Sequence, residues 1–224
     1  MTWLTANWPQ ILELTGDHVA LSVPAILLSI VIAVPIGRVA HRHRWLGRPL
    51  LGLATLMYAI PALPLLVVIP VLFGFPLRSP ASMIVALTIY GVALLVRTAA
   101  DAFAAVDTTV HEAAIALGHS SRAVFWRVDL PLATPVLLSG IRVVTVSTVG
   151  LVTIGALVGQ SSLGLLLTDG FQRGIVAEVV AGVIVTMVVA VVFDGLVLLA
   201  GRALMPWNRA TTARRPRAAR GAAS

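Results

Sequence analysis

Five long runs of apolar residues, separated by polar segments, constrain this sequence more than any other feature. A helix needs about 20 apolar residues to cross the roughly 30 Å hydrocarbon core of a bilayer. Because a helix pairs all of its backbone polar groups internally, it suits runs of this length in lipid. We therefore predict an all-α, polytopic membrane protein with about five transmembrane helices. The expected spans are about residues 19–37, 50–73, 81–96, 135–158 and 177–200.

The composition agrees with a membrane protein and argues against chemistry in this chain. Hydrophobic residues make up 58% of the 224 positions and charged residues 11%, outside the range of soluble domains. There is no cysteine, and so no thiolate metal site is possible. All 16 basic residues are arginine, which excludes a P-loop with its usual lysine. We expect no enzyme activity, no metal and no cofactor in this chain, so that any ATP would be used by a partner.

The arginines predict the topology. Basic residues collect in the cytoplasmic loops of membrane proteins. Segments that a five-span topology places inside hold Arg38, Arg42, Arg44, Arg48, Arg97, Arg122, Arg127, Arg202, Arg209, Arg214, Arg215, Arg217 and Arg220, whereas outer segments hold Arg78 and Arg173. We therefore expect the N-terminus outside and the C-terminus inside. The same distribution accounts for the net charge of +7 without nucleic acid as a partner.

Two terminal segments flank the expected transmembrane domain, residues 19–207. Residues 1–18 contain Trp3 and Trp8 and no basic residue, which favours a lead-in at the membrane interface. Residues 208–224 are basic and poor in large apolar side chains. We expect them to form a disordered tail near anionic membrane lipid.

A polar island at residues 107–131 interrupts the apolar runs and should lie outside the membrane. Thr109 and Glu112 have the spacing of a capping box, which predicts a helix start. Gly118 is suited to ending that helix, and Ser120 or Ser121 to capping a second one. The second helix should carry Val124, Phe125 and Val128, and Pro131 should end it. Val110, Ala114 and Leu117 are expected on one face of the first helix.

This island resembles the EAA loop of bacterial ABC-importer permeases, apart from Val128, where that family usually has isoleucine. The resemblance implies a type I ABC-importer permease fold in the bacterial cytoplasmic membrane. It also implies that the loop contacts a cytoplasmic ABC ATPase subunit. The residues that carry this expected ATPase-coupling role are Glu112, Ala113, Ala114, Gly118, Leu130 and Pro131.

Three further segments resemble osmoprotectant permeases, which import glycine betaine, choline, carnitine or proline betaine. They are residues 130–144, the outer loop around Gly159, Leu163 and Gly164, and residues 204–207. In the outer loop, Gln160, Ser161 and Ser162 replace part of the glycine-rich run common in that family, which should make it less flexible. The resemblance implies a second permease subunit, identical or paralogous, and an extracytoplasmic substrate-binding protein as partners.

Two features inside the spans suggest specific roles. Pro61, Pro64 and Pro70 should kink the second span. Near the kink, Met57, Tyr58 and Ile60 would line a pathway, or the kink would serve packing only. The candidate pathway residues of the whole chain are Tyr58, Pro61 and Tyr90. Arg142 and Asp194 fall at similar depths, and an intramembrane charge is costly unless paired. We predict an ion pair between them, with Arg97 as the rival partner of Asp194.

Three other functions compete with osmoprotectant import. A methionine-type amino-acid importer permease would share the coupling loop. A proton-coupled secondary transporter would need ionisable groups near the membrane centre and no such loop. A structural scaffold would have no ATPase partner.

Overall fold

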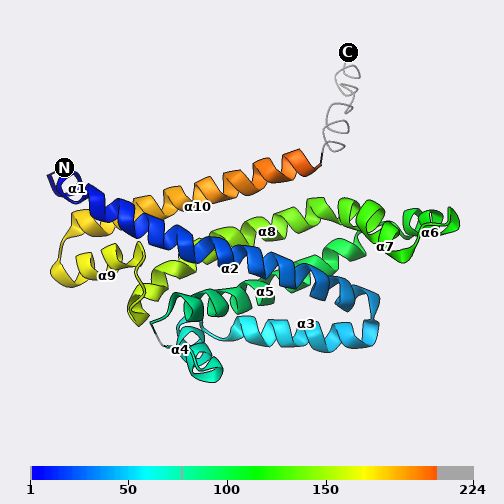
Figure 1. Ribbon diagram of the computed structural model, residues 1–224, viewed down its shortest axis with the longest axis horizontal. Coiled ribbons are helices and arrows are strands. Elements are labelled where there is room, and N and C mark those ends of the chain that lie inside the picture. The colour runs from blue at the N-terminus through cyan, green and yellow to red at the C-terminus, as the bar shows by residue number, and fades with distance from the viewer. Residues whose placement is uncertain (1, 77, 206–224) are drawn as a thin grey trace, which may run out of the picture.

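The computed structural model describes residues 2–76 and 78–205, which form helices joined by short turns (Figure 1). The elements are α1 (Thr2–Ala6), α2 (Trp8–Arg42), α3 (Arg44–Ala59), α4 (Ala62–Phe73), α5 (Pro80–Ala104), α6 (Thr108–Ala116), α7 (Ser121–Val124), a π-helical turn (Phe125–Asp129), α8 (Leu130–Val152), a 3-10 helix (Thr153–Val158), α9 (Gly164–Arg173) and α10 (Val176–Leu204). The all-α prediction is confirmed for this part of the chain. The expected tail at 208–224 and the end of the segment 204–207 lie outside the described residues.

Among the residues that the structure describes, four helical stretches are long and apolar enough to cross a membrane. They are Trp8–Arg42, Pro80–Ala104, Ser121–Val158 and Val176–Leu204. The pair α3 and α4 brings the number to five if it is counted as one span, although the pair is bent by 110°. The architecture therefore agrees with the expected count of about five.

The second predicted span is broken rather than kinked. Helix α3 ends at Ala59, and Ile60 adopts an extended conformation with φ −69° and ψ 126°. The residue before a proline is driven toward this conformation, and Pro61 has no N–H to continue the helix. The new helix α4 starts at Ala62. The sequence indicates the position of the disruption but underestimates its size.

The first membrane helix starts earlier than expected. Helix α2 begins at Trp8, with proline in its first turn, where the missing N–H costs nothing. Ile11 and Leu14 are buried in one cluster with Leu163 and Leu166. Residues 8–18, expected as an interfacial lead-in, therefore extend the first helix and join the core.

Helix α5 lies at the centre of the bundle and α10 at its edge. In the most apolar 18-residue stretch of each helix, 56% of α5 is buried in the protein, against 6% of α10. Small residues let α2 approach α5: a side chain at Gly37 would collide with Ala99, and one at Gly91 with Ser29. Such contacts are typical of helix pairs in membranes. Figure 1 shows α2 crossing over α5 and α8.

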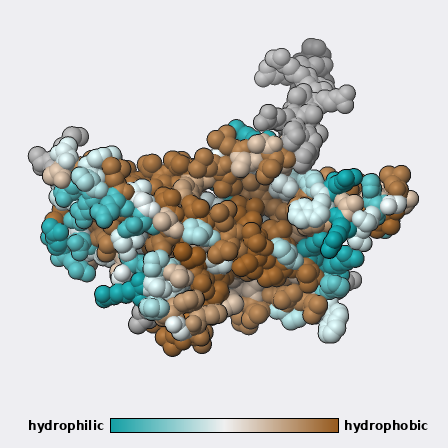
Figure 2. All heavy atoms as spheres, in the orientation of Figure 1, coloured by the Kyte–Doolittle hydropathy of each residue, from teal (hydrophilic) through white to brown (hydrophobic). Residues whose placement is uncertain are grey.

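The surface divides into an apolar middle and two hydrophilic ends. In Figure 2 a broad apolar belt covers the middle, and hydrophilic residues gather at the two ends. One end carries the N-terminus and α9, and the other carries α6 and α7 (Figure 1). We refer to these as the α9 end and the hairpin end, where the hairpin is residues 107–131.

Candidate functional site

The N-cap of the first hairpin helix is Asp107, two residues before the predicted position Thr109. Helix α6 starts at Thr108, and the N-cap is Asp107, whose carboxylate accepts a hydrogen bond from the Thr109 N–H at 2.8 Å. Thr109 is therefore inside the first turn, and the predicted capping box with Glu112 is wrong. The carboxylate takes the cap position because it also interacts favourably with the positive end of the helix dipole.

Gly118 ends α6 as predicted. Its φ is +82°, a left-handed backbone conformation that residues other than glycine rarely adopt. The Gly118 N–H donates to the Ile115 carbonyl at 2.9 Å, and the His119 N–H donates to the Ala114 carbonyl at 3.2 Å. This pair of bonds is a Schellman motif, which satisfies carbonyls left unpaired at the helix end. The glycine thus sets the sharp turn of the hairpin.

The second helix of the hairpin is continuous with a membrane span. Ser120 is its cap, because its hydroxyl accepts from the Ala123 N–H at 3.3 Å. The prediction that Pro131 ends this helix is wrong, since helical structure runs from Ser121 to Val158. A π-helical turn at Phe125–Asp129 precedes α8, which places Pro131 in the first turn of α8, where it is tolerated. Leu130 and Pro131 therefore join the hairpin to α8 without a loop.

A contact that the sequence analysis missed ties the two halves of the hairpin together. His111 Nδ1 lies 2.8 Å from Asp129 Oδ1. The histidine comes from α6 and the carboxylate from the π-helical turn. The two residues are 18 positions apart. In one continuous helix they would lie about 27 Å apart, so only the folded hairpin reveals the pair.

The base of the hairpin is anchored on α2 and α5. The guanidinium carbon of Arg38 lies 3.6 Å from the centre of the Phe125 ring, a cation–π contact. The rings of Phe125 and Phe103 are 6.1 Å apart. Val124 is buried. These contacts fix the hairpin to the ends of two membrane helices.

Several large apolar side chains of the hairpin are uncovered among its polar residues. Leu117 is 80% exposed and Trp126 is 65% exposed, and Val110 and Ile115 are also exposed. Of the three residues expected on one face of the first helix, Ala114 is buried, whereas Val110 and Leu117 are exposed. Glu112 and Ala113 are exposed as well. An exposed apolar surface of this kind on a rigid projection is typical of a protein contact.

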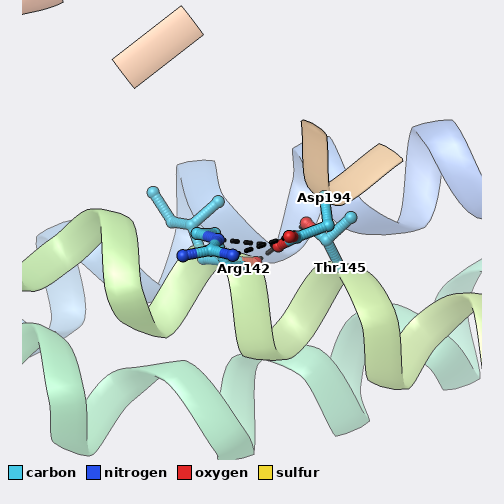
Figure 3. A network of polar contacts seen from close by, with 4 residues as sticks. Arg142, Thr145 and Asp194 are labelled. Carbon is cyan, nitrogen blue, oxygen red and sulfur yellow. Dashed lines mark hydrogen bonds and ion pairs between the residues drawn. The ribbon is translucent and has the colours of Figure 1, made fainter. Parts of the chain in front are cut away.

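Arg142 of α8 and Asp194 of α10 face one another in the bundle (Figure 3). Arg142 Nε donates to Asp194 Oδ1 at 2.7 Å, and Nη2 donates to Oδ2 at 2.6 Å. The structure thus selects Arg142 rather than Arg97 as the partner of Asp194. A bidentate pair of this type is among the stronger side-chain contacts, and here it links two membrane helices.

Two of the predicted pathway residues, Tyr58 and Tyr90, lie in contact. The rings of Tyr58 and Tyr90 are 5.3 Å apart. Tyr58 lies just before the break at Pro61, and Tyr90 comes from the central helix α5. Whether these residues line a pathway stays a prediction.

The outer loop is held firmly by the residues that replace glycine. Gln160 Nε2 donates to the Ser79 carbonyl at 3.1 Å, and Ser162 Oγ donates to the Val152 carbonyl at 3.2 Å. Ser161 is hydrogen-bonded to Asp17 of α2. Leu163 is fully buried, and Gly159 has a φ of +81°. At Gly164 a side chain would collide with the backbone of Thr153. The loop is therefore tied to α2, to the start of α5 and to the end of α8.

A bundle of apolar helices with a hairpin projecting at one end is compatible with a membrane transport subunit. The sequence profile of one family, described as "Binding-protein-dependent transport system inner membrane component", matches residues 23–206. The chain belongs to this family.

Two relatives and one solved structure illustrate the likeness. The osmoprotectant import permease protein OsmW of Salmonella typhimurium is 31% identical over 200 residues, which cover 87% of this chain and 91% of the relative. The glycine betaine/carnitine/choline transport system permease protein OpuCB of Bacillus subtilis is 27% identical over 206 residues, covering 92% and 94%. The MetNI methionine ABC transporter in an inward-facing conformation matches with a TM-score of 0.76 at 21% identity, covering 91% of this chain and 97% of the solved one. This last match supports the type I importer permease fold.

Proposed function

We propose that this chain is the permease subunit of an ATP-driven importer for osmoprotectants such as glycine betaine, choline or carnitine. The observation that carries the proposal is the similarity, over nearly the full length of both chains, to permeases named for these solutes. The match to MetNI covers a similar length but at 21% identity bears on the fold alone. Methionine import therefore gains no support from it.

The hairpin is the part that would engage the ATPase subunit. It offers an uncovered apolar surface around Leu117 and Trp126, while its base is fixed to α2 and α5. Because helical structure continues from the hairpin into α8, movement of the surface would be transmitted to the membrane span. ATP binding by the partner would then bias the bundle between two openings, as a two-state switch requires.

The remaining partners follow from the same proposal. An extracytoplasmic binding protein would deliver the solute at the α9 end, and a second permease subunit would complete the pathway. The N-terminus would lie outside and the C-terminus inside, since arginines concentrate toward the hairpin end. The chain would perform no ATP hydrolysis itself because it has no lysine for a P-loop.

Transport in proteoliposomes tests the proposal. The permease would be reconstituted with an ABC ATPase subunit and a substrate-binding protein from the same organism, and ATP-dependent uptake of labelled glycine betaine, choline, carnitine and methionine would be compared. We expect uptake of at least one quaternary ammonium solute and none of methionine. Uptake of methionine alone, or uptake driven by a proton gradient without ATP, would reject the assignment.

A further inference from the structure

A cavity of about 400 Å³ lies at the base of the hairpin, where α2, α5 and the hairpin meet. Its wall includes Arg38, His41 and Arg42 from the end of α2. From the hairpin come His111, Ser121 and Asp129. Polar and cationic side chains from two separate segments of the chain therefore converge on one space.

The cavity wall holds two arginines and one carboxylate, so its positive charge is only partly offset. Asp129 attracts Arg38, whereas Arg42, one helical turn away on α2, repels it. Asp129 is the carboxylate of the wall, and its Oδ1 is hydrogen-bonded to His111 at 2.8 Å. Within residues 2–76 and 78–205, neither arginine has a hydrogen bond or a salt bridge. An anion between the two guanidinium groups would relieve their repulsion.

The geometry of Arg38 suits a phosphate group. Its guanidinium lies over the face of Phe125, with its carbon 3.6 Å from the ring centre. Stacking holds the plane of the group and leaves its N–H edge available, and this edge matches the spacing of phosphate oxygens. The Ser121 hydroxyl is a further donor in the wall.

We propose that this cavity binds a phosphate group, and that the phosphate belongs to the headgroup of an anionic phospholipid. The cavity lies at the end of the membrane helix α2. Trp45, three residues after Arg42, is 83% exposed, and exposed tryptophan is typical of headgroup depth. Figure 2 shows hydrophilic residues bordering the apolar belt at this end. A lipid bound here would join α2 to the hairpin, whatever solute the protein carries.

Lipid binding by the purified full-length chain tests this site. Native mass spectrometry would measure retention of phosphatidylglycerol and phosphatidylcholine by the unaltered protein and by three variants. Arg42→Gln removes one positive charge and keeps Arg38 stacked on Phe125. Arg38→Gln/Arg42→Gln removes both positive charges. Arg48→Gln is the control, because Arg48 is exposed in the same basic region but does not line the cavity.

We expect the double variant to bind phosphatidylglycerol about tenfold more weakly, the cost of losing one or two charged hydrogen bonds. Arg42→Gln should show a smaller loss, and Arg48→Gln should match the unaltered protein. The unaltered protein should prefer phosphatidylglycerol over phosphatidylcholine, and millimolar inorganic phosphate should not displace the lipid.

Three results would overturn the proposal. They are undiminished phosphatidylglycerol binding by Arg42→Gln, an equal loss in Arg48→Gln, and displacement of the lipid by inorganic phosphate, which would assign the site to a soluble ligand. Circular dichroism checks the fold of each variant. If the double variant is unfolded, the comparison of Arg42→Gln with Arg48→Gln decides whether the cavity binds the lipid.

Discussion

At Gly118 a single backbone conformation determines the shape of the hairpin. A side chain there would meet no atom within 4 Å, so space does not restrict the residue. The restriction is φ, which at +82° costs an L-residue about 1–2 kcal/mol. The turn that presents Leu117 therefore depends on glycine for its backbone freedom alone.

We expect Gly118→Ala to loosen the hairpin by about 1–2 kcal/mol without preventing membrane insertion. Hydrogen exchange of α6 would measure the loosening, and uptake per ATP hydrolysed would fall. The matched control is Gly52→Ala in α3, also in open space but without a positive φ. That control should be neutral or slightly stabilising, because alanine is the better helix former. Equal exchange rates in the Gly118 variant and the unaltered protein would contradict the backbone argument.

The residues of the hairpin also show where sequence reasoning succeeds and where it ends. Gly118 and Ser120 each act on backbone groups a few positions away, so the sequence predicts Gly118 as the helix end and Ser120 or Ser121 as the next cap. Asp107 was missed because two caps compete within one turn, and only the folded helix shows which one is used. The pairs His111–Asp129 and Arg38–Phe125 join distant positions, and no local spacing predicts them.

The elements show a similar limit. Apolar length identifies the membrane helices, and proline identifies the disruption at Pro61. The 110° bend between α3 and α4 depends on how each half packs, which periodicity does not contain. The π-helical turn before α8 has no sequence signature either, and for that reason Pro131 was expected to end a helix that in fact continues.

The unbroken path from hairpin to α8 makes a prediction at this scale. Inserting two glycines between Asp129 and Leu130 should break the helix there, since each glycine in a helix costs about 1 kcal/mol. We expect ATPase binding to persist while uptake falls severalfold relative to ATP hydrolysis. The same insertion between Gly74 and Phe75, in the turn after α4, is the control and should keep the ratio of uptake to hydrolysis. An unchanged ratio in the first variant would show that α8 does not transmit the movement.

The ion pair between α8 and α10 makes a second prediction. Arg142→Gln and Asp194→Asn each leave one charge in the membrane without its partner, which is costly. We expect each single variant to lower the yield of folded protein. The double variant should recover part of the loss, because no charge remains. Yields would be compared by size-exclusion chromatography of tagged protein, and additive losses in the double variant would reject the coupling.

At the scale of the whole molecule, we propose that a separate ATPase subunit moves the transmembrane helices by acting on one projecting hairpin. Family membership and fold agree with a permease subunit that works with a separate ATPase subunit. The apolar belt in Figure 2 separates the two ends, so the hairpin can meet a partner on one side only. Substrate choice would depend on the opposite end and on a separate binding protein.

Cross-linking from a single cysteine tests this claim most directly, because the chain has no cysteine of its own. Leu117→Cys places a thiol on the hairpin surface, and Phe171→Cys places an equally exposed one at the α9 end, the two side chains being 80% and 83% exposed. Each variant would be assembled with the ATPase subunit and treated with a short thiol-to-amine cross-linker. We predict that Leu117→Cys is joined to the ATPase, to an extent that changes with bound ATP, and that Phe171→Cys is not. A hairpin cysteine that never reaches the ATPase in an actively transporting complex would contradict the account.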